Sequence, residues 1–241
     1  MSDKKTNVLL IFVKFPEPGK VKTRLCRHFS PEESAELYKA MVEDLYAKLV
    51  KNDGSENYDL HVYFSPIDKL SAFANWLGSS VTLIPQEGED LGEKLTNAMK
   101  KSFESGYEKA AAIGSDCIDL SVEDINNAFK ALDRNTQNSI KREVVIGPTD
   151  DGGYYLIGSS RFIPELFERI PWSTEKVYSE TVDKLKSLNI KFVELMRKYD
   201  IDFIDEVKRL WGDLQNREKL NAPRTKLVLE NRFNDSVIEK S

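Results

Sequence analysis

The 241-residue sequence predicts a single-domain three-layer α/β/α fold, in which helices cover both faces of a mostly parallel sheet. Short, continuous apolar runs recur along the chain, as expected for strands that are buried on both faces. Segments with helical periodicity and capping residues separate most of these runs, an alternation typical of parallel sheets. No Pro-, Gly- or Ser-rich linker divides the chain. We therefore expect one domain over residues 1–216 and a polar C-terminal appendage over residues 217–241.

Taken in order, apolar runs and turn residues mark the elements. A capping box at Ser30-Pro31-Glu32-Glu33 begins the first long helix. Strands are expected at residues 8–13, 60–64, 81–84, 110–113, 144–148 and 191–195, with a further extended run from Tyr154. Helices are expected at residues 31–50, 67–76, 91–105 and 121–132, from Ser173 or Thr174 to 188, and from about 205 through Leu210.

The composition excludes several classes of protein. The formal net charge of -5 leaves no basic footprint, so nucleic acid is not an expected partner. Cys26 and Cys117 match no metal-ligand or redox spacing and are interpreted as free thiols in a reducing cytosol. The apolar run at residues 8–13 is too short for a signal peptide or a membrane span. We therefore expect a cytoplasmic protein.

A loop rich in proline, glycine and basic residues follows the first strand. Pro16, Pro18 and Gly19 force a defined loop, and Gly19 lets the backbone approach a ligand closely. The residues expected to bind nucleotide phosphates are Lys14, Gly19, Lys22, Thr23 and Arg24 of this loop, with Gln86, Gly114 and Ser115 from the same sheet edge. On spacing alone, the cations would suit a solvated surface loop equally well.

Asp116 follows the apolar run that stops at Gly114, which places it at the carboxyl end of a strand. Ligands bind at that edge of open α/β sheets, and a carboxylate there can hold a divalent cation against phosphate oxygens. A structural role is the alternative. Asp119, three residues later, also suits the dipole of the helix that follows.

Two later segments carry further candidates. Asp151 precedes Gly152-Gly153, a tight turn whose backbone can pass under a sugar or phosphate, although a hairpin turn has the same pattern. Trp172 either stacks on an acceptor or base or belongs to the core. Asp200 and Asp202 alternate after the last strand, so both carboxylates are expected to face the same cleft.

These blocks together resemble a bacterial family of nucleotide-diphospho-sugar transferase-like proteins with the glycosyltransferase A (GT-A) fold, described as a domain of unknown function, DUF2064. The resemblance runs from about residue 8 to 214. It rests on Lys14-Phe15-Pro16-Glu17-Pro18-Gly19 with Lys22-Thr23-Arg24-Leu25, on Gly114-Ser115-Asp116-Cys117, on Asp151-Gly152-Gly153-Tyr154-Tyr155-Leu156-Ile157-Gly158 and on Asp200-Ile201-Asp202. The cation loop is also similar to that of phospholactate guanylyltransferases. One departure is Ile118, where the family usually has proline.

The resemblance implies a metal-dependent transferase that uses a nucleotide-activated donor. Asp116, with Asp202 or Asp200, would hold Mg²⁺ or Mn²⁺, and the loop cations would hold the donor's phosphates. Asp151 would act as a base toward an acceptor hydroxyl. Gly152, Gly153, Tyr154 and Trp172 would shape the donor or acceptor pocket. Glycosyl transfer from a nucleotide sugar to a small-molecule acceptor is the first hypothesis. Nucleotidylyl transfer from a nucleoside triphosphate and a non-catalytic nucleotide-binding module are the alternatives.

Overall fold

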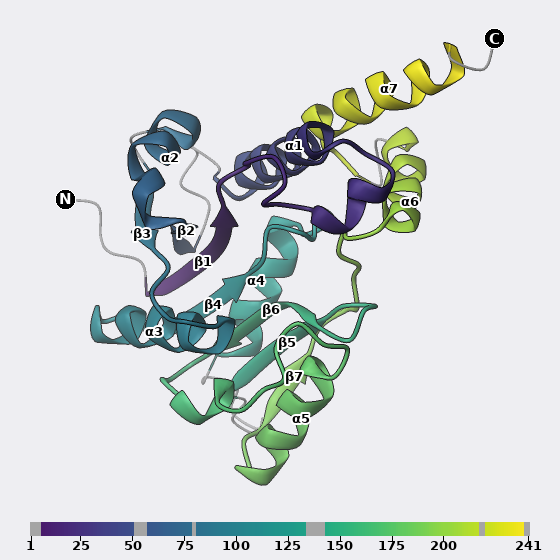
Figure 1. The fold of residues 1–241 in the computed structure, drawn as a ribbon. Helices are drawn as coiled ribbons and strands as arrows, with labels where there is room; N and C mark the ends of the chain where they lie inside the picture. The colour runs from purple at the N-terminus through teal and green to yellow at the C-terminus, as the bar shows by residue number, and fades with distance from the viewer. Residues whose placement is uncertain (1–5, 51–56, 79–80, 134–142, 217–219, 239–241) are drawn as a thin grey trace.

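The computed structural model describes residues 6–50, 57–78, 81–133, 143–216 and 220–238 (Figure 1). Its centre is a seven-stranded sheet in the order β3-β2-β1-β4-β6-β5-β7. The strands are β1 (Asn7–Lys14), β2 (Tyr58–Ser65), β3 (Thr82–Pro85), β4 (Lys109–Ile113), β5 (Val144–Pro148), β6 (Tyr154–Ser159) and β7 (Phe192–Glu194). The predicted mostly parallel sheet is confirmed.

The exception to the parallel order is β6, which runs antiparallel to both of its neighbours, β4 and β5. A turn of five residues, 149–153, joins β5 to β6, and only antiparallel strands can be joined by so short a connection. The Asp-Gly-Gly segment is therefore a hairpin turn, one of the two interpretations that its sequence allows.

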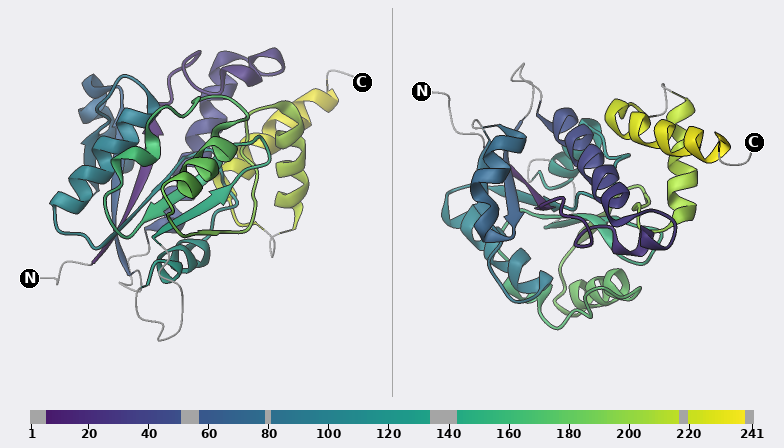
Figure 2. Two further views of the ribbon diagram at one scale, coloured as in Figure 1. Left: turned by 90° about the horizontal axis from the view of Figure 1, so that it is seen from below. Right: turned by 45° about the horizontal axis from the view of Figure 1, so that its top comes forward.

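Helices cover both faces of the sheet, which gives the three predicted layers (Figure 2). The helices are α1 (Pro31–Leu49), α2 (Leu70–Leu77), α3 (Leu91–Glu104), α4 (Val122–Ala131), α5 (Val177–Ser187), α6 (Ile204–Gln215) and α7 (Pro223–Ile238), with short 3₁₀ turns η1 (Thr23–Arg27), η2 (Ile67–Lys69) and η3 (Pro164–Phe167). None of the helices in the described segments is long and apolar enough to cross a membrane.

Alternate residues of β1 separate the two main cores. Leu9 and Ile11 pack with α1, α2 and α4, whereas Val8 and Leu10 pack with α3 and α5 on the other face. Burial on both faces explains why the strand is continuously apolar in sequence. A third core lies outside α1 and joins it to η1, α6 and α7.

The segment predicted as an appendage contains α7, which lies along α1 (Figure 2). The buried carboxylate of Asp44 in α1 accepts hydrogen bonds from the backbone amides of Arg224 (3.3 Å) and Thr225 (2.8 Å) at the start of α7. A side chain from another helix therefore provides the N-terminal cap. Residues 217–219 and 239–241 of the predicted appendage lie outside the described residues.

Candidate active site

The carboxyl ends of β1 and β4 lie side by side, because these strands pair directly in parallel. Tyr38 of α1 fixes the two ends relative to each other. Its hydroxyl accepts a hydrogen bond from the backbone amide of Lys14 (3.0 Å) and lies 2.9 Å from the Ser115 hydroxyl. The cation loop after β1 and the Asp116 turn after β4 are therefore neighbours, as the sequence predicts.

Lys22 brings the cation loop and the candidate metal ligands together. Its ammonium forms ion pairs with Asp116 and, at 3.1 Å, with Asp202, while its own side chain is only 3% exposed. Two left-handed residues shape the loop, Gly19 with φ 72° and Lys22 with φ 46°. A lysine in this conformation is uncommon and requires support from its surroundings. The two carboxylates provide that support. We call Lys22, Asp116 and Asp202 the Lys22 cluster.

The charges of the Lys22 cluster stabilise one another. Burial by itself lowers the pKa of Lys22, but Asp116 and Asp202 outweigh it, so the pKa lies above its ordinary value. Burial by itself raises the pKa of Asp202, but Lys22 and then Arg24 outweigh it, so the pKa is lowered. The Arg24 guanidinium lies 2.7 Å from the Asp202 carboxylate and above the Phe203 ring. Lys22 and Asp202 are therefore both charged at neutral pH.

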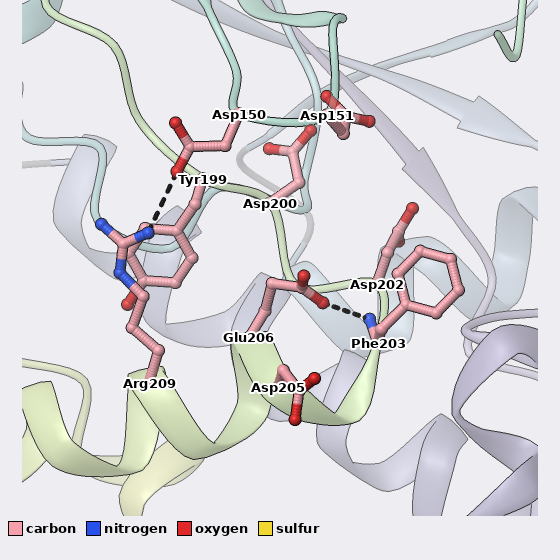
Figure 3. A pocket seen from close by; sticks show the side chains of 9 residues that line it. All are labelled: Asp150, Asp151, Tyr199, Asp200, Asp202, Phe203, Asp205, Glu206 and Arg209. Carbon is pink, nitrogen blue, oxygen red and sulfur yellow. Dashed lines mark hydrogen bonds and ion pairs between the residues drawn. The ribbon is translucent and has the colours of Figure 1, made fainter. Parts of the chain in front are cut away.

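An acidic cavity of about 300 Å³ adjoins the Lys22 cluster at Asp202 (Figure 3). Six carboxylates and one arginine line it, with two aromatic rings; its residues are Asp150, Asp151, Tyr199, Asp200, Asp202, Phe203, Asp205, Glu206 and Arg209. The Arg209 guanidinium is held by Asp150 at 3.0 Å and lies over the Tyr199 ring at 3.8 Å. The arginine is thus already occupied by protein groups, and the cavity keeps an excess of negative charge.

Alternation along the chain orients Asp200 and Asp202 toward this cavity. Tyr199 and Ile201 are buried in the third core, and the Ile201 amide donates to the Asp116 carbonyl at 3.1 Å. Asp200 and Asp202, which flank Ile201, line the cavity, and so does part of the Tyr199 side chain. Burial, followed by the neighbouring Asp116, raises the pKa of Asp200 to about 8, despite the opposing effect of Lys22.

Asp151 lies at the tip of the β5–β6 hairpin. Its carboxylate accepts hydrogen bonds from the Thr149 hydroxyl (2.5 Å) and the Gly153 amide (3.0 Å), which fixes the turn. Gly152 has φ 87°, and a Cβ at this position would collide with the backbone of Glu175. The chain therefore needs glycine here for close packing of the protein, and Asp151 lines the cavity in an exposed position.

Four of the predicted site residues have protein partners instead of facing the cavity. Ser115 is buried against Tyr38. The Gln86 side-chain amide donates to the carbonyls of Val13 and Tyr63, which joins the ends of β1 and β2. Tyr154 and Trp172 pack edge to face, with ring centroids 6.3 Å apart, in the core beneath α3 and α5. The remaining predicted residues of the phosphate set, namely Lys14, Gly19, Thr23, Arg24 and Gly114, are exposed at the site edge.

Sequence reasoning missed several residues that shape the site. Tyr38, Lys48, Lys198 and Arg209 lie far from the recognised motifs and become relevant only through contacts. The Lys48 ammonium, for example, donates to the carbonyls of Ile118 (2.6 Å) and Leu120 (3.2 Å). It thus holds the turn in which Ile118 replaces the proline usual in the family. The signal available in the sequence was slight, since none of these four residues belongs to a recognised motif.

The carboxylates of the site suit a divalent cation chemically. Mg²⁺ and Mn²⁺ prefer oxygen ligands, and Asp116 and Asp202 already share one positive charge, that of Lys22. Within the described residues, no group of three or more carboxylate, histidine or cysteine side chains is arranged as a metal-ligand set. Asp116 and Asp202 therefore offer two oxygen ligands, and a metal ion bound to them would need its remaining ligands from other groups.

Comparison with known proteins identifies the family. Residues 49–174, just over half of the chain, match the family described as uncharacterized proteins conserved in bacteria, DUF2064. The chain belongs to this family. A DUF2064 protein was expected from the motifs, and the matched residues include Asp116 and Asp151. No curated protein matches the sequence.

Solved structures support the same assignment. A protein from Desulfovibrio desulfuricans G20, provisionally named a nucleotide-diphospho-sugar transferase, is 33% identical with a TM-score of 0.85, and 98% of each chain is covered. Two nucleotidyltransferases share only the fold. They are a CMP:2-keto-3-deoxy-manno-octonic acid synthetase (12% identity, TM-score 0.52, 85% and 96% covered) and a cytidylyltransferase from Leptospira borgpetersenii serovar Hardjo-bovis (15%, 0.52, 95% of each). The chain therefore shares its fold with transferases that use nucleotides, and these comparisons support a transferase of that kind.

Proposed function

We propose that this DUF2064 protein is a metal-dependent glycosyltransferase that transfers a sugar from a nucleotide-diphospho-sugar to a small-molecule acceptor. The Lys22 cluster carries this proposal. It places a buried cation and two carboxylates at the sheet edge where a diphosphate and its metal ion would bind. The provisional name of the 33% identical relative supports the same donor class.

The residues have separate roles in this proposal. Lys22 and Arg24, with Lys14 and the loop amides, would bind the donor's phosphates. Asp116 and Asp202, assisted by Asp200, would hold Mg²⁺ or Mn²⁺, which neutralises charge on the departing diphosphate. Asp151 would accept the proton of the acceptor hydroxyl at the rim of the cavity.

The acidic cavity favours glycosyl transfer over nucleotidylyl transfer. In the nucleotidylyl alternative, a phosphorylated small molecule attacks the α-phosphate of a nucleoside triphosphate, and its phosphate would have to approach the acidic cavity while Arg209 is occupied by Asp150. A neutral acceptor hydroxyl meets no such repulsion. The similarity of the cation loop to guanylyltransferases keeps nucleotidylyl transfer as the second candidate.

A thermal-shift screen tests the proposal, because a ligand of the folded state raises the melting temperature (Tm) by mass action. Nucleotide sugars, nucleoside triphosphates and nucleoside diphosphates are tested with Mn²⁺, with Mg²⁺ and with EDTA. We expect a metal-dependent shift with a nucleotide sugar in the parent protein. Asp116→Asn should lose this shift. Asp183→Asn, which makes the same chemical change on the exposed face of α5, should keep it.

Product analysis with the donor found in the screen then separates the alternatives. Release of a nucleoside diphosphate supports glycosyl transfer, whereas release of pyrophosphate from a triphosphate indicates nucleotidylyl transfer. Tight, metal-independent nucleotide binding without turnover of any donor would indicate a non-catalytic binding module.

A further inference from the structure

Lys198 lies at the junction of the three chain segments that carry the site's carboxylates. These segments are the turn after β4, the β5–β6 hairpin and the strand exit after β7. Through its backbone, Lys198 extends the pairing of β7 with β5. Its amide donates to the Pro148 carbonyl (3.1 Å), and its carbonyl accepts from the Asp150 amide (3.0 Å). The strand exit is thereby fixed against the hairpin that carries Asp150 and Asp151.

The side chain of Lys198 extends from this point to the third segment, the turn after β4. Its ammonium lies 3.2 Å from the Asp119 carbonyl, 3.2 Å from the Asp119 carboxylate and 3.2 Å from the Asp124 carboxylate. An ammonium has three protons to donate, so these three oxygens satisfy it completely. The side chain is 8% exposed. Burial lowers the pKa of Lys198, but Asp119 and Asp124 outweigh burial and raise it overall, so the charge persists at neutral pH.

The candidate metal ligands lie close in sequence to the residues that make these contacts. Asp116 precedes Asp119 on the turn, while Asp200 and Asp202 follow Lys198 on the strand exit. Between the two segments, the Ile201 amide donates to the Asp116 carbonyl at 3.1 Å. A shift of the turn relative to the strand exit would therefore separate Asp116 from Asp202, the two partners of Lys22.

We propose that Lys198 is a positioning residue, whose ammonium holds the Asp116 turn in register with the strand exit and the hairpin. This inference deepens the proposed function and rests on it where the metal is concerned. The partners of the Lys198 ammonium, Asp119 and Asp124, belong neither to the cavity lining nor to the Lys22 cluster. The ammonium therefore acts on Asp116 and Asp202 through the segments that carry them.

Lys198→Met tests this role, because it removes the ammonium and keeps most of the buried stem. The partners Asp119 and Asp124 are partly exposed, with 40% and 24% of their side chains accessible, so water can solvate them and the protein is expected to fold. Lys109→Met is the matched control. Lys109 is also a poorly exposed lysine paired with a carboxylate, that of Asp133, at the opposite edge of the same β4–α4 unit.

The first readout is hydrogen exchange by NMR without metal, which does not depend on the proposed function. In Lys198→Met, the amides of Ile201 and Asp150 should lose protection, although their acceptors are backbone carbonyls that the substitution leaves in place. Lys109→Met should leave both unchanged. Unchanged exchange of both amides in Lys198→Met would overturn the inference, even if its Tm falls.

The second readout is Mn²⁺ binding by calorimetry, well below the Tm of every variant. We expect the dissociation constant to rise about ten-fold in Lys198→Met, as for residues that orient metal ligands, and to recover in part in Lys198→Arg. Lys109→Met should bind as the parent does. Equal Mn²⁺ affinity of Lys198→Met and the parent would contradict a positioning role. A parent that binds no Mn²⁺, alone or with donor, would refute the metal in the proposed function, and the exchange experiment would then decide the inference alone.

Discussion

Two buried lysines at the carboxyl edge of the sheet have the same kind of partners but different roles. Lys22 and Lys198 each form ion pairs with two carboxylates, and their side chains are 3% and 8% exposed. Lys198 also donates to the Asp119 carbonyl. Its partner Asp124 belongs to the capping box of α4, in which the Asp124 carboxylate accepts a hydrogen bond from the Ser121 amide. In the Lys22 cluster, by contrast, Asp202 borders a cavity. An ammonium whose three protons all have protein partners, like that of Lys198, indicates a structural role. A carboxylate that lines a cavity, like that of Asp202, indicates a ligand site.

The backbone position of each lysine explains this difference. Lys22 belongs to a loop outside the regular structure and has a left-handed backbone, so its position depends on the ion pairs themselves. The backbone of Lys198 forms hydrogen bonds with Pro148 at the end of β5 and with Asp150, and these bonds do not depend on its side chain. A lysine on a loop can exchange its carboxylate partners for phosphates, whereas a lysine fixed in a strand-like segment holds its neighbours in place.

The largest effect is expected from Asp116→Asn. The amide keeps the shape of the side chain but loses the charge that attracts both Lys22 and a metal ion. We expect at least about a 100-fold loss of turnover with the donor found in the screen, comparable to the loss of one essential electrostatic group. Its circular dichroism and cooperative melting should remain like those of the parent. Turnover within a few-fold of the parent value would show that Asp116 has no catalytic role.

Lys22→Met is expected to have the next largest effect, on ligand binding more than on folding. The substitution leaves Asp116 and Asp202 facing each other, and their exposure to water limits the cost to stability. Affinity for the nucleotide donor should fall by about ten-fold or more, the usual cost of removing a charge-assisted contact. Lys20→Met, on the exposed part of the same loop, should bind normally. Equal calorimetric affinity of both variants would place the phosphates elsewhere.

Asp200 allows a test by pH, because it is a buried carboxylate two residues after Lys198 and forms no ion pair among the described residues. Its pKa of about 8 exceeds the ordinary value near 4, so the folded state binds the proton more tightly than the unfolded state. Its contribution to stability is therefore complete below pH 4 and is lost as the pH rises toward 8. The Tm advantage of Asp200→Asn over the parent should grow by a few degrees between pH 5 and pH 8.5 in EDTA. A constant difference in Tm would argue against this pKa shift.

The smallest effect is expected from Arg24→Ala. Its guanidinium is half exposed, and Asp202 keeps Lys22 as a partner when Arg24 is removed. Exposed ion pairs contribute about 0.2–1 kcal/mol, so the Tm should change by about 2 °C or less. A fall of Tm as large as that of Lys22→Met would mean that the two cations contribute equally to the Lys22 cluster.

The sequence by itself determined which segments become strands and which carboxylates follow them. Apolar runs are local signals, and they placed Asp116, Asp151, Asp200 and Asp202 after strands. The alternation of Asp200 and Asp202 was also predictable, since Ile201 between them is fully buried and does not line the cavity.

Only the tertiary structure decided how these residues meet. The insertion of β6 between β4 and β5, the cap that Asp44 provides for α7 and the burial of Lys22 and Lys198 depend on contacts between residues far apart in the chain. Gln86, Ser115 and Trp172 were chosen by position along the chain, and the fold gives them structural partners. A local sequence pattern determines which element carries a side chain and which way that side chain points. For a charged side chain such as Lys22 or Lys198, burial costs free energy unless partners from distant parts of the chain offset it, so the tertiary structure determines its contacts.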